Sequence, residues 1–161
     1  MKTGELWLID PRTPPGPRAV VCVLEAGDSA EPSPLRRSNG ENADRSASEN
    51  LVSVLFTDSE LEAATDADLC YAAGEAAPWT VRVCCDLIGP VRAVQFVRLL
   101  GALPAISDNV LLDASWGEFA PDLASRRGSP LRGPEDPRWG PRKAQLEEAQ
   151  RYWIVPFDDP D

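Results

Sequence analysis

The fold of this 161-residue chain is decided by the stretch Arg18-Ala19-Val20-Val21-Cys22-Val23-Leu24, an apolar and largely β-branched run behind one arginine. A continuous run of this kind predicts a strand that is buried on both faces. The same chemistry returns in Leu51-Val52-Ser53-Val54-Leu55-Phe56-Thr57, which predicts a second strand. The core of the protein is therefore expected to form around these two segments.

Shorter segments with strand chemistry flank these two runs. They are residues 5–9, 68–71 and 79–88. The last of them is expected to end at Gly89-Pro90, because glycine and proline interrupt strands. From Val91 the apolar residues follow a helical spacing that ends at Gly101, and a second helix is expected over 109–114 with Asp108 as its cap. Short strands followed by one or two helices predict an α+β, mainly β fold.

Two polar segments interrupt or follow this pattern. Residues 26–50 hold no aromatic residue and one large aliphatic residue, so burial cannot offset their ordering entropy, and we expect a mobile surface loop. Residues 116–161 form a tail rich in proline, arginine and aromatic residues, with a short helix expected near 142–153. The domain is thus expected to span residues 1–115. The tail is expected to pack on it, to bind another subunit or partner, or to hang free.

The composition excludes several classes of site. The chain has no His, which removes a Ser-His-Asp triad, a Cys-His pair and an H-E-x-x-H metal site, and neither a metal nor another cofactor is expected. The net charge of −10 argues against broad, sequence-independent binding to phosphate backbones. Residues 1–115 hold 9 basic and 17 acidic side chains, so most of this charge lies on the domain itself.

The sequence carries no signal for a membrane or for secretion. No stretch approaches the roughly 20 apolar residues of a membrane span, and the N-terminal MKTGELWLID is acidic where a secretory signal would stay apolar. A cytoplasmic protein without membrane contact is expected. The cysteines lack C-x-x-C spacing and are expected to be buried free thiols: Cys22, Cys70, Cys84 and Cys85.

Polar residues at strand ends are the candidates for chemistry. Arg18 opens one expected strand and Thr57 ends another. Arg82 and Asp86 share a face of a third strand, because they are four positions apart. A carboxylate near an arginine can accept a proton while the cation stabilises charge on a phosphate. Taken alone, such an exposed pair is more often a solvated surface feature than a catalytic one.

The order of the strand motifs resembles that of the PemK/MazF family of toxin endoribonucleases. The resemblance rests on five short motifs between residues 3 and 114: Gly4-Glu5-Leu6-Trp7-Leu8-Ile9-Asp10, Arg18-Ala19-Val20-Val21-Cys22-Val23-Leu24, Val52-Ser53-Val54-Leu55-Phe56-Thr57, Val83-Cys84-Cys85-Asp86-Leu87-Ile88 and Leu99-Leu100-Gly101-Ala102-Leu103. It implies a small SH3-like barrel of the PemK/CcdB type, usually a homodimer with RNA in the groove between subunits. It also implies a toxin-antitoxin system, with metal-independent cleavage of single-stranded RNA and an antitoxin protein as partner.

The resemblance also implies roles for single residues. Arg18 falls on the family's active-site arginine, Thr57 on its phosphate-contacting threonine and Asp86 on the aspartate proposed as general base. Arg12 and Arg82 are the expected substrate-binding residues. In the implied reaction a base takes the proton of the ribose 2′-OH, and that oxygen attacks the adjacent phosphorus. The arginine and threonine hold the charged phosphoryl oxygens, and the products are a cyclic phosphate and a free 5′-hydroxyl.

Two alternatives stay open at this point. The first is a non-catalytic barrel that binds a protein partner, as the gyrase-targeting CcdB toxins of the same superfamily do; the acidic composition and the aromatic tail favour it. The second keeps the barrel but gives the tail a role in neutralisation or assembly, with a helix near Leu146 to Trp153 covering a groove of the domain.

Overall fold

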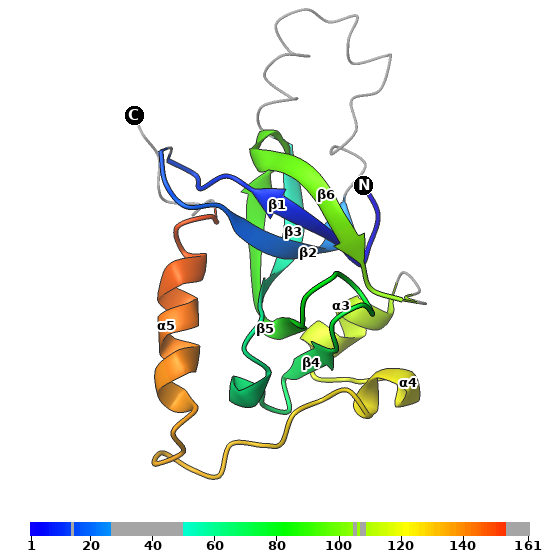
Figure 1. Ribbon diagram of the computed structural model, residues 1–161, viewed down its shortest axis with the longest axis vertical. Coiled ribbons are helices and arrows are strands. Elements are labelled where there is room, and N and C mark those ends of the chain that lie inside the picture. The colour runs from blue at the N-terminus through cyan, green and yellow to red at the C-terminus, as the bar shows by residue number, and fades with distance from the viewer. Residues whose placement is uncertain (14, 27–49, 105, 107–108, 154–161) are drawn as a thin grey trace, which may run out of the picture.

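The computed structural model describes residues 1–13, 15–26, 50–104, 106 and 109–153 (Figure 1). Its elements are, in chain order, β1 (Glu5–Ile9), β2 (Ala19–Ala26), β3 (Leu51–Asp58), the 3₁₀ turn η2 (Leu61–Ala63), β4 (Asp68–Tyr71), β5 (Val81–Arg92), the 3₁₀ turn η3 (Ala93–Gln95), β6 (Phe96–Ala102), α3 (Val110–Ser115), α4 (Pro121–Ala124) and α5 (Trp139–Ala149). The strands form one antiparallel sheet with the order β4-β5-β3-β2-β1-β6. The predicted α+β, mainly β fold with helices near its C-terminal end is therefore confirmed.

Both faces of the central strands are buried, as the two apolar runs predict. Along β2, Cys22 and Leu24 belong to one hydrophobic cluster, while Val21 and Val23 belong to another. Successive side chains of a strand point to opposite faces, so these two clusters are the two sides of the sheet. Most of the predicted loop 26–50 lies outside the described residues.

Helices α3 and α4 cover the first side of the sheet. Leu111 and Ala114 of α3 and Leu123 of α4 are buried in the same cluster as Leu6 and Leu55. The helix predicted over 109–114 is thus present as α3, shifted by one residue. Its predicted cap, Asp108, lies outside the described residues.

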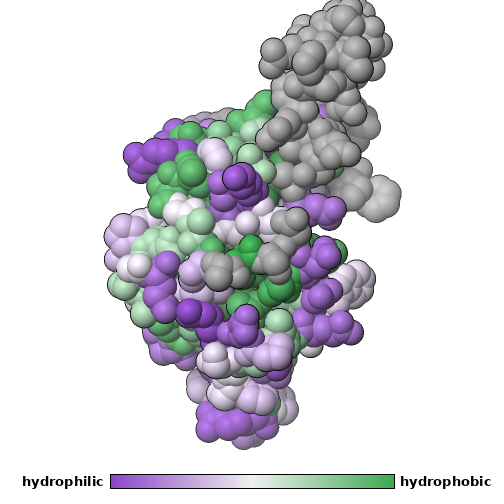
Figure 2. Space-filling view, turned by 90° about the vertical axis from the view of Figure 1, so that its right-hand side faces the viewer, coloured by the Kyte–Doolittle hydropathy of each residue, from purple (hydrophilic) through white to green (hydrophobic). Residues whose placement is uncertain are grey.

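Figure 2 views the molecule from the right-hand side of Figure 1 and shows hydrophobic residues exposed between hydrophilic ones, so this surface is mixed in spite of the net charge of −10.

Helix α5 and the residues after it cover the second side, which we call the α5 face. Ala149 and Tyr152 are buried there with the side chains of four strands: Ile9, Val21, Val23, Val52, Val54, Phe56 and Val91. Trp153 packs against the same cluster. The helix expected near 142–153 begins three residues earlier and ends at Ala149. Part of the tail therefore completes the core.

Arginines fasten the tail to the domain. Arg138 donates hydrogen bonds to the Asp136 carboxylate at 2.7 Å and to the carbonyl oxygen of Ala64 at 2.7 Å. Hydrogen bonds from Arg138 hold the pKa of the Asp136 carboxyl well below its ordinary value. Arg126 pairs with Glu75 at 2.9 Å and lies over the ring of Tyr71 at 4.3 Å. The arginine content of the tail is thus used for docking onto an acidic domain.

The helix predicted from Val91 to Gly101 is wrong. The chain stays extended to Arg92, makes the turn η3 and continues as β6, which pairs with β1. The helical spacing does not mark a buried face, because Val94 is 63% and Leu99 is 48% exposed. Pairing with β1 satisfies the backbone of β6, and this long-range contact outweighs the local pattern.

The end predicted for the previous strand at Gly89-Pro90 is also wrong, since β5 runs through both residues. β4 pairs only with residues 81–84 of β5, so around Pro90 this strand is bonded to β3 alone among the described strands. A proline without an N–H is tolerated at such an edge. Gly89 is needed for another reason, because the indole of Trp153 occupies the space that a side chain would fill.

The described cysteines are free thiols, as predicted. Cys22, Cys84 and Cys85 are buried and Cys70 is partly buried. Burial raises the pKa of the Cys22 thiol to about 12, so this thiol stays protonated at neutral pH. No helix of the described residues is long and apolar enough to cross a membrane.

Candidate functional site

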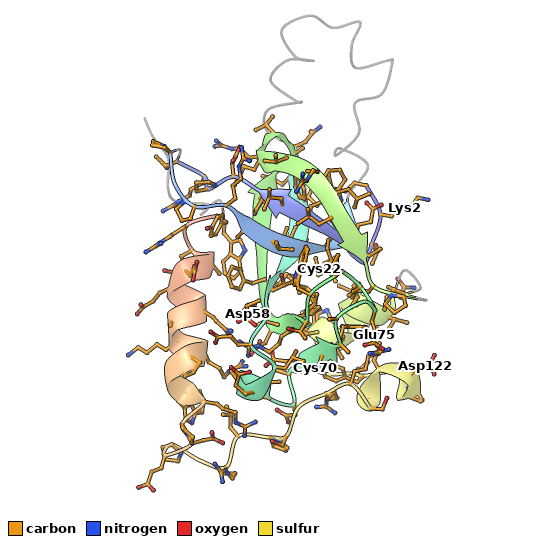
Figure 3. All side chains as sticks on the ribbon, in the orientation of Figure 1. Lys2, Cys22, Asp58, Cys70, Glu75 and Asp122 are labelled. Carbon is orange, nitrogen blue, oxygen red and sulfur yellow. The ribbon has the colours of Figure 1, made fainter. Side chains whose placement is uncertain are left out.

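A groove of about 390 Å³ lies between the sheet and α5. We call it the α5 groove; it is lined by Arg18, Ala19, Val20, Phe56, Thr57, Asp58, Ser59, Glu60, Trp79, Pro141, Ala144, Gln145 and Glu148. The sheet side comes from the start of β2, the end of β3 and the residues before β5, and the other wall is one side of α5. Figure 3 labels Asp58 in this region, between the strands and the helix.

Two residues predicted from different strands meet in this groove. Arg18 precedes β2 and Thr57 is the penultimate residue of β3, and β2 and β3 are antiparallel neighbours. Their side chains therefore reach the same end of the sheet. An arginine and a hydroxyl that line one groove are suited to hold the oxygens of a phosphate group.

Arg18 is available to a ligand. Its side chain is 52% exposed, and its Nε donates a hydrogen bond to the Asp10 carboxylate at 2.8 Å. An exposed pair of this kind contributes about 0–1 kcal/mol, so an anionic ligand can compete for the guanidinium. Thr57 is buried, and its hydroxyl donates to the carbonyl oxygen of Val20 at 2.6 Å. To donate to a phosphate, this hydroxyl must turn away from Val20.

Asp58 is the carboxylate that lines the groove beside Thr57. The guanidinium of Arg82 donates two hydrogen bonds to it, at 2.9 and 2.5 Å, and the backbone N–H of Glu60 and the side-chain amide of Gln145 donate two more. Burial raises the pKa of Asp58 to about 6, although the charge of Arg82 acts in the opposite direction. A carboxyl with this pKa is suited to exchange protons near neutral pH.

Arg82 is completely buried beneath the groove. Besides the bonds to Asp58, its Nη1 donates to Asp68 at 3.1 Å and to the carbonyl oxygen of Ala63 at 3.1 Å. Asp68 is also without exposed surface. Arg82 is a predicted substrate-binding residue, but its buried side chain can influence a ligand in the groove only indirectly, through Asp58. Its position instead makes it the cation that pairs with the two carboxylates Asp58 and Asp68.

Asp86 does not line the α5 groove. It lies in the bulge of β5 where the pairing with β3 jumps from Cys84 to Ile88. Its carboxylate accepts a hydrogen bond from Arg142 of α5, and burial raises its pKa while the charge of Arg142 lowers it. Asp86 is thus held on the α5 face, next to the groove but outside its lining.

A chain of alternating charges connects these groups. It runs Asp58, Arg82, Asp68, Arg142, Asp86, since Arg142 also lies 3.4 Å from Asp68. Two guanidinium groups therefore join three carboxylates of three strands to α5. In the pair Arg82–Asp68, where neither side chain is exposed, removing one partner costs about 3–5 kcal/mol, because it leaves an uncompensated buried charge.

The remaining predicted site residue, Arg12, lies on the connection between β1 and β2. It is partly buried, and its backbone N–H donates to the carbonyl oxygen of Arg151 at 3.0 Å. Its side chain is not part of the groove lining. No group of three or more acidic or cysteine side chains among the described residues is arranged to hold a metal ion.

Sequence reasoning missed the groove residues Asp58, Trp79, Gln145 and Glu148 and the ion-pair partner Arg142. Asp58 directly follows Thr57, so its position next to the candidate site was visible in the sequence. The α5 residues carry no such signal, because nothing local links the tail to the end of β3.

The fold and the groove define a mainly β protein with an arginine and a threonine at one open end of its sheet. No protein-family model and no curated protein matches the chain. Among solved structures, the chain is similar to the Mycobacterium tuberculosis toxin MazF-mt6, with 13% sequence identity and a TM-score of 0.44. The similarity covers 70% of this chain and 93% of that toxin chain.

Proposed function

We propose that this protein is a toxin-type endoribonuclease that cleaves single-stranded RNA in the α5 groove without a metal ion. The observation that carries the proposal is the meeting of Arg18 and Thr57 in one groove, with the carboxylate of Asp58 beside them. This provides a cation and a hydroxyl for the phosphate and a carboxylate for the proton.

The proposed reaction uses the ribose 2′-OH as nucleophile. A carboxylate removes its proton, the 2′-oxygen attacks the adjacent phosphorus, and the bond to the 5′-oxygen breaks. The 5′-oxygen takes a proton from water, so the products are a cyclic phosphate and a 5′-hydroxyl. Arg18 stabilises the negative charge of the phosphoryl oxygens, and Thr57 donates a hydrogen bond to one of them once it turns from Val20.

Two carboxylates are candidates for the proton acceptor. Asp86 has this role by the family resemblance, but it must first be released from Arg142. Asp58 already lies in the groove, and its pKa of about 6 suits the role, but its carboxylate must likewise give up a hydrogen bond from Arg82 or Gln145. Separate Asp58→Asn and Asp86→Asn variants distinguish them. Replacing the proton acceptor should remove the increase of the cleavage rate with pH on the acidic side of the profile, whereas replacing the other carboxylate should leave this increase in place.

The test is cleavage of a long mixed-sequence RNA in EDTA by the full chain. We expect Arg18→Ala to lower kcat by about 10²-fold or more while the fold is retained, because the side chain is exposed. Arg98→Ala, which changes an exposed arginine of β6 outside the groove, is the matched control. A substrate with 2′-deoxy sugars should not be cut. The proposal fails if the wild type cuts neither this RNA nor total cellular RNA, or if Arg18→Ala is as active as the wild type.

An antitoxin protein, a homodimer and a cytoplasmic location belong to the same proposal through the family resemblance. Light scattering of the purified chain measures the oligomeric state directly. A monomer at all concentrations would remove the homodimer from the proposal and leave the groove chemistry unchanged.

A second candidate function is a non-catalytic module that binds a protein partner. The charge of the groove favours it, because Asp58, Glu60 and Glu148 face a single arginine, Arg18. Such a groove fits a cationic peptide segment better than a bare phosphate. A complex that survives Arg18→Ala but is lost in Glu60→Gln/Glu148→Gln, together with no RNA cleavage by the wild type, would establish this function instead.

A further inference from the structure

Trp79 lies in the α5 groove without a role in the chemistry described above. It comes just before β5, and 38% of its surface is exposed. No acceptor among the described residues bonds its indole N–H. The groove thus contains a large, flat apolar surface together with an unused hydrogen-bond donor.

A flat aromatic surface beside a phosphate-binding arginine fits one kind of ligand well. Bases of single-stranded nucleic acids stack on exposed aromatic side chains, and each stack contributes substantially to binding. In a duplex the faces of the bases are already stacked on one another, so a surface of this kind selects unpaired bases. Arg18 lines the same groove as Trp79, so the groove offers a stacking surface for a base together with a cation for a phosphate.

The carboxylates of the groove add a preference among bases. Glu60 and Glu148 are exposed and line the groove from the sheet side and from α5. Carboxylates accept hydrogen bonds from exocyclic amino groups, as Glu and Asp do from cytosine N4. Uracil carries no exocyclic amino group, and its single donor, N3–H, is flanked by two carbonyl oxygens that a carboxylate repels. Glu60 and Glu148, which disfavour a bare phosphate, therefore favour an amino-bearing base.

We propose that the α5 groove is a subsite for one unpaired, amino-bearing nucleobase, stacked on Trp79 and read by Glu60 and Glu148. This inference rests on the proposed RNA cleavage and names its selectivity: single strands over duplexes, and cytosine, adenine or guanine over uracil. Trp79 is here a binding residue and takes no part in proton transfer.

Binding is measured by fluorescence anisotropy with short end-labelled 2′-fluoro oligoribonucleotides, oligo(C), oligo(U) and a duplex, which cannot be cut. We expect oligo(C) to bind more tightly than oligo(U) and than the duplex. Trp79→Ala should weaken oligo(C) binding roughly fivefold or more, whereas Trp79→Phe should retain most of it. Trp116→Ala, which removes an 80% exposed tryptophan outside the groove, should bind like the wild type.

Two further readouts separate stacking from charge. The dependence of affinity on salt should be unchanged in Trp79→Ala and weaker in Arg18→Ala, because only the arginine contacts a phosphate. Glu60→Gln/Glu148→Gln should reduce the preference for oligo(C) over oligo(U), because an amide can also donate to uracil oxygens. Melting curves of all variants establish that the fold is intact.

The subsite and the proposed function fail in different ways. If the wild type cleaves RNA but Trp79→Ala binds and cleaves like the wild type, the subsite is refuted and the function stands. Equal affinity for oligo(C) and oligo(U), or for duplex and single strand, also refutes it. If the wild type neither binds nor cuts RNA, and a Lys- and Arg-containing peptide binds through Trp79 instead, both are refuted in favour of a cationic partner.

Discussion

Gly89 of β5 is in direct contact with Trp153, the last described residue of the tail. A Cβ atom placed on Gly89 would fall inside the van der Waals surface of the indole ring. The absence of a side chain at Gly89 in the sheet thus makes room for the indole of Trp153 from the tail. This contact ties the segment after α5 to the sheet at a point far from the arginine anchors of residues 126–138.

Gly89→Ala should therefore destabilise the protein by about 1–3 kcal/mol, because the added methyl group overpacks the contact with Trp153. Denaturant unfolding followed by circular dichroism measures this change. Gly140→Ala is the matched control: no atom lies near its added Cβ, and alanine favours the helix, so its stability should be equal or slightly higher. Equal stability of Gly89→Ala and the wild type would show that Trp153 does not dock as described.

Two buried tyrosines provide a second pair of variants. The hydroxyl of Tyr152 donates to the carbonyl oxygen of Pro17 at 2.7 Å, whereas the buried hydroxyl of Tyr71 has no partner among the described residues. Tyr152→Phe should cost about 0.5–1.5 kcal/mol of unfolding free energy, since it removes a hydrogen bond. Tyr71→Phe should be neutral or stabilising, because it removes an unsatisfied polar group. The reverse order in thermal unfolding would contradict both assignments.

The buried charge chain predicts a strong effect at its centre. Arg82→Ala should destabilise the fold by about 3–5 kcal/mol, because it leaves Asp68 buried with only the more distant Arg142 as a cation. Arg98→Ala, at an exposed position of β6, should change the unfolding free energy by less than about 0.5 kcal/mol. Urea titration of both variants checks this. Similar unfolding midpoints for Arg82→Ala and Arg98→Ala would rule out a structural role for the chain of alternating charges.

Asp58 predicts a pH dependence with a defined sign. Its pKa is about 6 in the folded protein and close to its ordinary value of 3.8 in the unfolded chain. Between these pH values the folded state binds more protons, so the contribution of Asp58 to stability decreases as the pH rises from about 4 to about 6. Asp58→Asn lacks this titration. The unfolding free energy of the wild type minus that of Asp58→Asn should therefore fall over this range and level off above it; a rising difference would mean that Arg82 lowers the pKa instead.

The parts of the fold that follow from local chemistry could be predicted from the sequence, and the others could not. The apolar runs around Val21 and Val54 define β2 and β3. Alternate side chains of each run enter the two hydrophobic clusters, so both faces of each strand are buried. β6 escaped prediction because it exists through its pairing with β1, more than 80 positions earlier in the sequence. Val94 of the turn η3 and Leu99 of β6 have the spacing of a helical face, but both are exposed.

The candidate site divides in the same way. Arg18 and Thr57 could be found because they stand at the ends of predictable strands. The hydrogen bond between Gln145 and Asp58 joins residues 87 positions apart, and no local sequence pattern predicts it.

The role of the tail also changes which experiments are possible. Cutting the chain at Ser115 would uncover the α5 face, so point variants of α5 must replace truncation as tests of its function.

The position of α5 in the chain has a consequence for synthesis. The groove has one wall from residues 18–79 and the other from residues 141–148. A ribosome makes the first wall long before the second. A nascent chain that has emerged only through β6 therefore has strands but no groove, and the second wall arrives with the same segment that closes the core. A ligand of the groove can therefore bind only after α5 has been synthesised. Binding activity begins late in translation, after the strands of the sheet have been made.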